Sequence, residues 1–196
     1  DFKSSKYVAV VGEEITFTYG GENVTPVSNY WLTIKRDGEV VVSENGNYYK
    51  DTGRTMTFDT PGTYTAYVNV NHNSGGVNSP EISFTILSPL PSVPEITEFA
   101  PVNWEDKSFK TVNIDWTETT NTTRYEIRFY DYDTNELIKA FEYSNIYHSG
   151  HVSDTRIAPG HYNVRVFAIN ATDGESCKSE TGSEPRELTV NPAPIP

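Results

Sequence analysis

The sequence contains a single cysteine, Cys177, so the chain cannot form an internal disulfide. Small extracellular animal domains are commonly stapled by disulfides, and their absence favours a bacterial surface protein or a cytosolic one. There is one methionine, and alanine and leucine are scarce, which argues against helices. No apolar run approaches the roughly 18 residues of a membrane helix. No signal peptide is present, and because the sequence starts at Asp1 we expect it to be an excised fragment.

Positive charge is also scarce. The chain has 15 Lys and Arg against 27 Asp and Glu, a net charge of −12. No run of five or more like charges occurs, so the acidic residues are spread over the surface and favour solubility. Nucleic acid and anionic membrane surfaces both require basic patches, and the composition argues against each as a partner.

The abundant residues are those of β-strands, including 13 tyrosines alongside many threonines and valines. Hydrophobic side chains recur at every second position, which is the pattern of half-buried strands. Asp37-Gly38 is a strong hairpin signal between two such runs. Each half of the chain contains about seven short runs, so we predict an all-β protein with two consecutive antiparallel β-sandwich domains. The runs in order are 15–19, 30–34, 40–42, 56–58, 64–70, 82–86, 96–99, 112–116, 125–129, 137–141, 164–168 and 188–190.

Proline divides the chain. Residues 88–94 carry three prolines, which prefer extended backbone and cannot occupy a central strand. We predict a first domain over residues 1–88, a proline-rich linker over 89–94 and a second domain over 95–191. Residues 192–196 resemble the linker and predict the start of another one, so we expect an array of modules.

A tight turn followed by tyrosine occurs in each half, at Pro61-Gly62-Thr63-Tyr64 and at Pro159-Gly160-His161-Tyr162. A tyrosine at this corner can return its hydroxyl to the upstream backbone. The first motif and the alternating valines after it resemble bacterial immunoglobulin-like domains of the polycystic-kidney-disease (PKD) type, over roughly residues 5 to 88. Only Arg36-Asp37-Gly38 remains of the Asp-Gly-rich segment of that type, so we use the broader term immunoglobulin-like.

The second half resembles a fibronectin type III domain, over about residues 93 to 191. The features that match are the opening prolines, Trp116 on the second strand, the Tyr125-Glu126-Ile127-Arg128 strand, and the run from Gly160 to Asn170. The resemblance implies tandem bacterial extracellular modules and a buried Trp116.

Motifs for catalysis are missing from the sequence: it has no phosphate loop, nucleophile elbow or zinc-protease helix. We therefore predict that the chain is not an enzyme and uses no cofactor. Cys177 has no histidine placed to activate it and is interpreted as a stray exposed or half-buried thiol. His148-Ser149-Gly150-His151 is interpreted as a polar loop.

Asp131, Asp133 and Asn135 alternate as in a calcium loop and are weak metal candidates. The position that needs glycine is Glu136, and strand-like runs flank the segment. A hairpin turn between the third and fourth strands explains these residues better.

Aromatic residues outside the core pattern are the main functional signal. Trp31 is out of phase with Tyr30, Leu32 and Ile34, so it should face outward. Trp104 lies in a polar stretch with Lys107, and Tyr130 and Tyr132 could add to such a surface. Flat aromatic rings among polar groups suit the C–H face of a sugar. The alternatives are that Trp31 is a core residue in a shifted register and that Trp104 packs at the junction of the domains.

Two functions follow from these patterns. The first is a non-catalytic extracellular binding module of a larger bacterial surface or secreted protein, binding polysaccharide through Trp31, Trp104, Tyr130, Tyr132 and Lys107. This function requires an exposed Trp31 or Trp104 with polar groups nearby. The second is a structural spacer, adhesin stalk or protein-interaction module without a small ligand, in which all three tryptophans are at least half buried. We expect a monomer at the cell surface or outside the cell, with no nucleic-acid partner and no membrane insertion.

Overall fold

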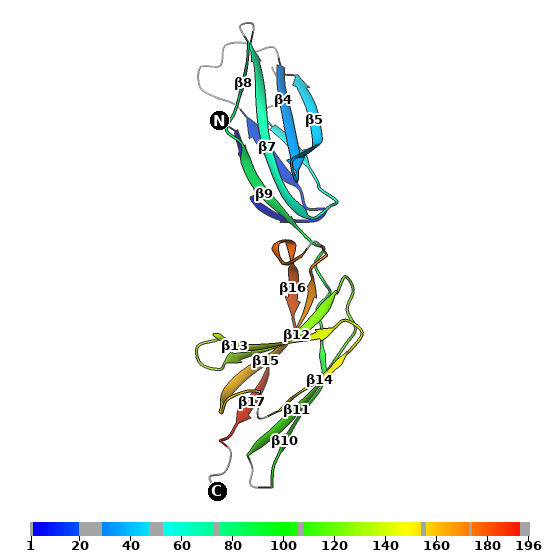
Figure 1. Cartoon of the computed structure of the whole chain (residues 1–196), viewed down its shortest axis with the longest axis vertical. Coiled ribbons are helices and arrows are strands. Elements are labelled where there is room, and N and C mark those ends of the chain that lie inside the picture. The colour runs from blue at the N-terminus through cyan, green and yellow to red at the C-terminus, as the bar shows by residue number, and fades with distance from the viewer. Residues whose placement is uncertain are drawn as a thin grey trace. The chain divides into compact units, whose positions relative to one another are not determined.

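The computed structural model describes residues 2–19, 29–47, 53–72, 75–105, 108–153, 156–172 and 174–192. The chain forms two compact units, which are Asp1–Pro89 with Ala171–Lys178 and Leu90–Asn170 with Ser179–Pro196. Within the described ranges the helical structure is limited to the short 3₁₀ helix η1 (Glu175–Cys177). The prediction of an all-β chain built from antiparallel sheets is confirmed (Figure 1). No helix among these residues is long or apolar enough to cross a membrane.

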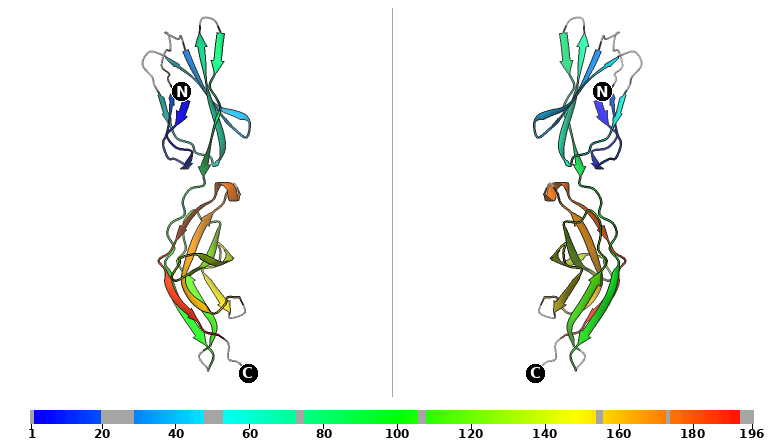
Figure 2. Two further views of the ribbon diagram at one scale, coloured as in Figure 1. Left: turned by 90° about the vertical axis from the view of Figure 1, so that its left-hand side faces the viewer. Right: turned by 90° about the vertical axis from the view of Figure 1, so that its right-hand side faces the viewer.

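The first unit contains two sheets. A three-stranded sheet has the order β1-β3-β6, and a six-stranded sheet has the order β2-β9-β7-β4-β5 with β8 added beside β7. Neighbours pair antiparallel apart from β2, which lies parallel to β9. Figure 2 shows this unit turned edge-on, with two layers of strands. The strands are β1 (Phe2–Ser4), β2 (Val8–Val10), β3 (Ile15–Tyr19), β4 (Asn29–Arg36), β5 (Glu39–Asn47), β6 (Gly53–Met56), β7 (Gly62–His72), β8 (Gly75–Asn78) and β9 (Ile82–Leu87).

The core of the first unit lies between these sheets. Phe17 of β3 packs against Phe84 of β9, with ring centroids 5.4 Å apart, and joins the two layers. Burying one such side chain contributes about 1.5–3 kcal/mol, so the alternating positions account for the pairing register. The predicted inward residues Tyr30, Leu32 and Ile34 are all buried, which excludes the shifted register for Trp31.

The second unit repeats the arrangement. A three-stranded sheet has the order β10-β11-β14, and a five-stranded sheet has the order β13-β12-β15-β16 with β17 also pairing with β15. The strands are β10 (Ile96–Asn103), β11 (Phe109–Trp116), β12 (Arg124–Asp131), β13 (Leu137–Ser144), β14 (Ser149–Ser153), β15 (Gly160–Asn170), β16 (Ser179–Gly182) and β17 (Arg186–Val190).

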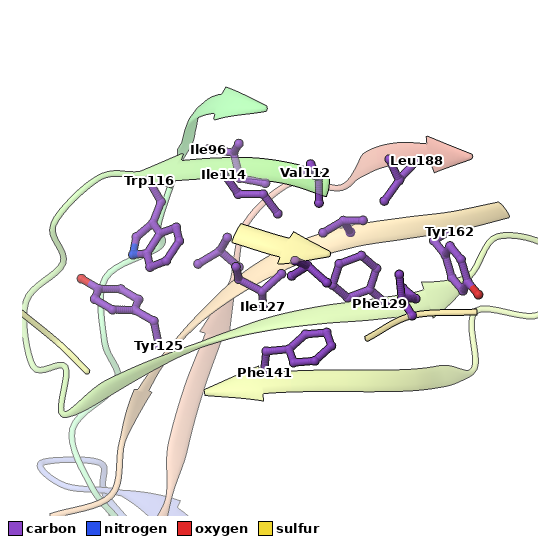
Figure 3. Close-up of a cluster of buried hydrophobic side chains, with 14 of the residues drawn as sticks. Ile96, Val112, Ile114, Trp116, Tyr125, Ile127, Phe129, Phe141, Tyr162 and Leu188 are labelled. Atoms are coloured by element: carbon purple, nitrogen blue, oxygen red, sulfur yellow. The ribbon is translucent and has the colours of Figure 1, made fainter. Parts of the chain in front are cut away.

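The core of the second unit is one cluster of inward side chains from both of its sheets. Figure 3 shows Trp116 and Tyr125 at one end of the cluster and Tyr162 at the other, with Ile127 and Phe129 between them. Trp116 is buried, as predicted, and lies 5.4 Å from the Tyr125 ring centroid.

Both predicted tyrosine corners are present. The Tyr64 hydroxyl donates to the Thr60 carbonyl and the Tyr162 hydroxyl donates to the Ala158 carbonyl, each at 2.7 Å. The predicted Asp37-Gly38 hairpin joins β4 to β5, and both residues have positive φ, 52° and 85°. Positive φ at two successive residues is the backbone of a type I′ turn, which Asp-Gly favours.

Three local predictions were wrong. Residues 149–151 belong to β14 and not to a loop, because Val152 supplies the single buried apolar anchor of a short strand. Ser74-Gly75-Gly76 is typical of a turn, but Gly75 and Gly76 already lie in β8, with Gly75 opposite His72, and Ser74 lies outside the described residues. Cys177 is buried, and a free cysteine packs readily as a small apolar side chain.

Candidate functional site: the outer face of the six-stranded sheet

The outward positions of the six-stranded sheet form a surface almost without charge, which we call the Trp31 face. They alternate with buried residues such as Leu32, Ile34, Ala66 and Val68, so they project from the opposite side of the sheet. The described positions include Trp31, Thr33, Lys35, Val40, Ser43, Thr63, Thr65, Tyr67, Asn69, Ser83 and Thr85. None of them is acidic, although the chain has 27 Asp and Glu.

Trp31 lies on β4, next to the edge strand β5, and is 44% exposed. Its indole Nε1–H donates to Ser43 Oγ at 2.6 Å. Ser43 pairs with Thr33 and not with Trp31, so the hydrogen bond draws the ring diagonally across to β5. Thr33 faces outward and yet is only 7% exposed, as expected beneath the ring. We conclude that one face of the indole lies on the sheet and the other faces solvent.

Hydrogen-bonding groups surround the ring. Asn69 lies opposite Trp31 on β7, and its side-chain amide donates to Asn78 Oδ1 at 2.7 Å. Tyr67 lies opposite Thr33 and adds a second aromatic ring. Lys35 Nζ lies 5.2 Å from the Tyr67 ring centroid. A flat ring edged by amides and hydroxyls can stack on a pyranose and bond to its hydroxyls.

Trp104 has less of its surface available for stacking than its exposure suggests. It follows β10 and is 48% exposed. Its backbone N–H donates to the Ser108 carbonyl at 2.8 Å, and Lys110 Nζ lies 4.4 Å from its ring centroid. The lysine occupies one face of the indole. Lys107, the predicted polar neighbour, lies outside the described residues.

Tyr130 and Tyr132 lie at the end of β12 and in the turn after it. Tyr130 is half-buried, with its ring centroid 6.3 Å from that of Phe167. Tyr132 stacks on His161 with centroids 3.8 Å apart and donates its hydroxyl to Glu187 Oε1 at 3.2 Å. The Glu187 carboxylate raises the pKa of Tyr132 by its charge and by this hydrogen bond. Both tyrosines therefore already have protein partners.

The five predicted sugar-binding residues do not form one surface in the structure. Trp31 lies in the first unit, Trp104 follows the three-stranded sheet of the second unit, and Tyr130 and Tyr132 belong to its five-stranded sheet region. The exposed fractions of Trp31 and Trp104 both lie just under one half. Each ring is therefore open enough for the sugar-binding function and buried enough for the spacer function, so exposure alone does not separate the two functions. The flat, uncharged surroundings distinguish Trp31.

The carboxylate of Asp131 organises the β12–β13 hairpin. Its Oδ1 accepts hydrogen bonds from the backbone N–H of Asp133 and Thr134 and from the Thr134 hydroxyl, at 2.8–3.1 Å. These bonds, those from Thr134 first, lower the pKa of Asp131. Asn135 has a positive φ of 56° and its N–H donates to the Asp131 carbonyl. The weak calcium candidates thus form the hairpin turn, and the described residues contain no group of three or more potential metal ligands.

The five-stranded sheet of the second unit carries an ionic network on its outer face, which the sequence analysis did not identify. We call Arg124, Glu126, Arg128 and Glu180 the ion-pair ladder. Arg128 Nε donates to Glu126 at 2.7 Å, and its Nη atoms donate to both oxygens of Glu180 at 3.0 and 2.5 Å. Arg124 Nη2 donates to Glu126 at 3.4 Å.

The ion-pair ladder is shielded from solvent to an unusual degree. Glu126 and Arg128 are 7% and 8% exposed, and the Arg128 guanidinium lies 4.1 Å from the Phe167 ring centroid. Burial lowers the pKa of Arg128, but the hydrogen bonds to Glu180 and Glu126 outweigh it and raise the pKa. Arg128 is charged, and its guanidinium already binds Glu126 and Glu180 and lies on the Phe167 ring. Its hydrogen-bond donors on this face are therefore used within the protein and are not available to a ligand.

Comparisons with known proteins identify no family for this chain. No family model and no curated protein matches. The FN1–FN3 domains of chicken CNTN1 are similar, with 14% identity, a TM-score of 0.41, and coverage of 98% of this chain and 64% of that one. A two-domain fibronectin type III segment of chicken tenascin has 12% identity, a TM-score of 0.49, and 98% coverage of each chain. The scores are low, so the fold description rests on the sheets themselves.

Proposed function

We propose that the chain is a non-catalytic, extracellular polysaccharide-binding module of a larger bacterial surface or secreted protein, and that it binds through the Trp31 face. The flat indole of Trp31, held by Ser43 and flanked by amide and hydroxyl groups, carries the proposal. Such a surface satisfies both needs of a sugar ring, which are an apolar stack and hydrogen-bond partners at its rim. The proposed domains are immunoglobulin-like over residues 1–88 and fibronectin type III-like over 95–191.

Affinity electrophoresis of the full chain with soluble glucan, xylan, mannan and uronic-acid polymers tests this proposal. We expect retardation by at least one polymer and its loss in Trp31→Ala, because the stacking surface is removed. Trp104→Ala is the matched control and should keep the retardation. Unchanged migration with every polymer would remove the basis of the proposal.

A spacer function is the second candidate, and the ion-pair ladder favours it for the second unit. The unit's own side chains fill the outer face of its larger sheet, so that face presents no open ring for stacking. In this division of roles, only substitutions on the Trp31 face change binding. Loss of retardation in Trp104→Ala or Tyr132→Ala, with Trp31→Ala unaffected, would assign binding to the second unit instead.

A further inference from the structure

From the charge on the Trp31 face we infer that its ligand is an acidic polysaccharide, and that Lys35 pairs with the carboxylate of a uronic acid residue. The inference rests on the proposed function, since it specifies the sugar that the same face binds. It begins from a contrast in charge. The whole chain carries −12, whereas the described outward positions of this sheet carry one lysine and no carboxylate.

Lys35 is the cation of this face and has no ion-pair partner among the described residues. Its Nζ contact is the Tyr67 ring, 5.2 Å from the centroid. Elsewhere the chain's acidic residues are used to pair cations, as in Arg54 with Glu44 at 2.7 Å and Arg128 with Glu180. An ammonium without an ion-pair partner, on the same face as an exposed tryptophan in an acidic protein, complements an anionic ligand.

The spacing suits a chain molecule lying along β4. Trp31 and Lys35 are four residues apart on one strand and project from the same face, about 13 Å apart at the usual strand rise. Between them lie Ser43 and Tyr67, which supply hydroxyl groups to this row, and the buried Thr33 separates the two. A short oligosaccharide along this line would stack one ring on Trp31, bond to the hydroxyl row and place a later carboxylate at Lys35.

The outward strand positions around Lys35 carry no carboxylate, which gives this selectivity a second physical basis. A polyanion approaching the rest of this protein meets net negative charge, which disfavours unspecific attachment. On the Trp31 face the outward strand positions add no like charge, and the exposed carboxylates of Asp37 and Glu81 lie at its border, in the β4–β5 turn and just before β9. The preference for acidic over neutral glycans therefore arises from the attraction between Lys35 and a carboxylate. The outward strand positions add no negative charge that would cancel this attraction.

The test compares polygalacturonate with the same polymer in highly methyl-esterified form, using affinity electrophoresis and calorimetry on the full chain. Esterification keeps the sugar rings and removes the charge. We expect the free acid to bind about two- to fivefold more tightly than the ester, the range of one exposed ion pair. Lys35→Gln should weaken binding of the acid about two- to fivefold, the range of one exposed ion pair, and leave the ester unaffected. Lys35→Arg should restore it.

Lys110→Gln is the matched control, because Lys110 also lies over an aromatic ring, that of Trp104, but in the second unit. It should bind both polymers as the parent chain does.

Equal binding of acid and ester, unchanged in Lys35→Gln, would overturn the uronate inference and leave polysaccharide binding intact. Failure of every polymer, acidic or neutral, would overturn both proposals. Equal losses in Lys35→Gln and Lys110→Gln, with dextran sulfate bound as well as polygalacturonate, would assign the effect to general charge and overturn the inference.

Discussion

The two large sheets of this protein have similar interiors and opposite exteriors. In the first unit the outward positions are a tryptophan, a tyrosine, amides and hydroxyls with one free lysine. In the second unit they carry the ion-pair ladder, in which two carboxylates and two arginines satisfy one another. The interior of each sheet is an alternating apolar set closed by a tyrosine corner. The comparison shows that inward positions determine the fold, while outward positions are free to differ in function.

The first way to break this comparison is to remove Arg128, which has the largest expected effect. Arg128→Ala leaves Glu180 without its bidentate partner and Glu126 with only Arg124. Removing one member of a buried pair costs about 3 kcal/mol or more, because the remaining charge is shielded from water. Urea unfolding followed by tryptophan fluorescence in a Trp31→Phe, Trp104→Phe background isolates Trp116, the buried reporter of the second unit, since the chain has three tryptophans.

Arg165→Ala is the control for that measurement. Arg165 pairs with Arg128 across β12 and β15 and lies on the same outer face, but it has no ion pair among the described residues. Its removal should cost less than about 0.5 kcal/mol, as for most surface substitutions. Equal losses in the free energy of unfolding for both variants would show that the ion-pair ladder is not what stabilises this face. The contrast with the Trp31 face would then weaken.

The interiors can be compared through the tyrosine corners. Tyr64→Phe and Tyr162→Phe each delete a 2.7 Å hydrogen bond and leave a carbonyl, that of Thr60 or Ala158, without this donor. Each should cost about 1–2 kcal/mol, and the two costs should be similar. Hydrogen exchange measured by mass spectrometry on peptides from β7 and β15 reports on the two units in one sample. A large effect in one unit alone would show that the corners are not equivalent.

Sequence periodicity predicts most of the fold. In both units the strands alternate inward and outward side chains, and a recognisable tyrosine-corner motif marks one turn. The outward direction of Trp31 followed from its parity with Tyr30, Leu32 and Ile34. The strand β14 could not be found in this way, because Val152 is its single fully buried residue and one residue has no period. The sequence predicts an exposed or half-buried thiol at Cys177, and its burial depends on tertiary packing that local sequence does not encode.

The surroundings of the site were less predictable, because they depend on pairing between distant strands. Trp31 meets Ser43 only through the β4–β5 register and Asn69 only through the β4–β7 register. The ladder joins Arg128 to Glu180 across 52 residues of sequence. Nothing local marks these residues as partners. Conversely, Trp104, Tyr130 and Tyr132 were grouped by residue type, and the structure places them on separate elements with protein partners of their own.

The smallest expected effect compares the two equivalent hairpins and depends on pH. The β4–β5 turn uses Asp37-Gly38 with positive φ, whereas the β12–β13 turn uses the Asp131 carboxylate as an acceptor. Because folding lowers the pKa of Asp131, its ionised form stabilises the second unit above the ordinary aspartate pKa of about 3.9, and this contribution is lost as pH falls through the lowered value. Asp131→Asn should therefore flatten the acid limb of the stability profile of the second unit, monitored through Trp116. Asp133→Asn, a carboxylate with no acceptor role in these turn bonds, is the control. An unchanged acid limb in Asp131→Asn would mean that the Asp131 carboxylate does not stabilise the β12–β13 turn through its charge. The two hairpins would then not differ in this respect.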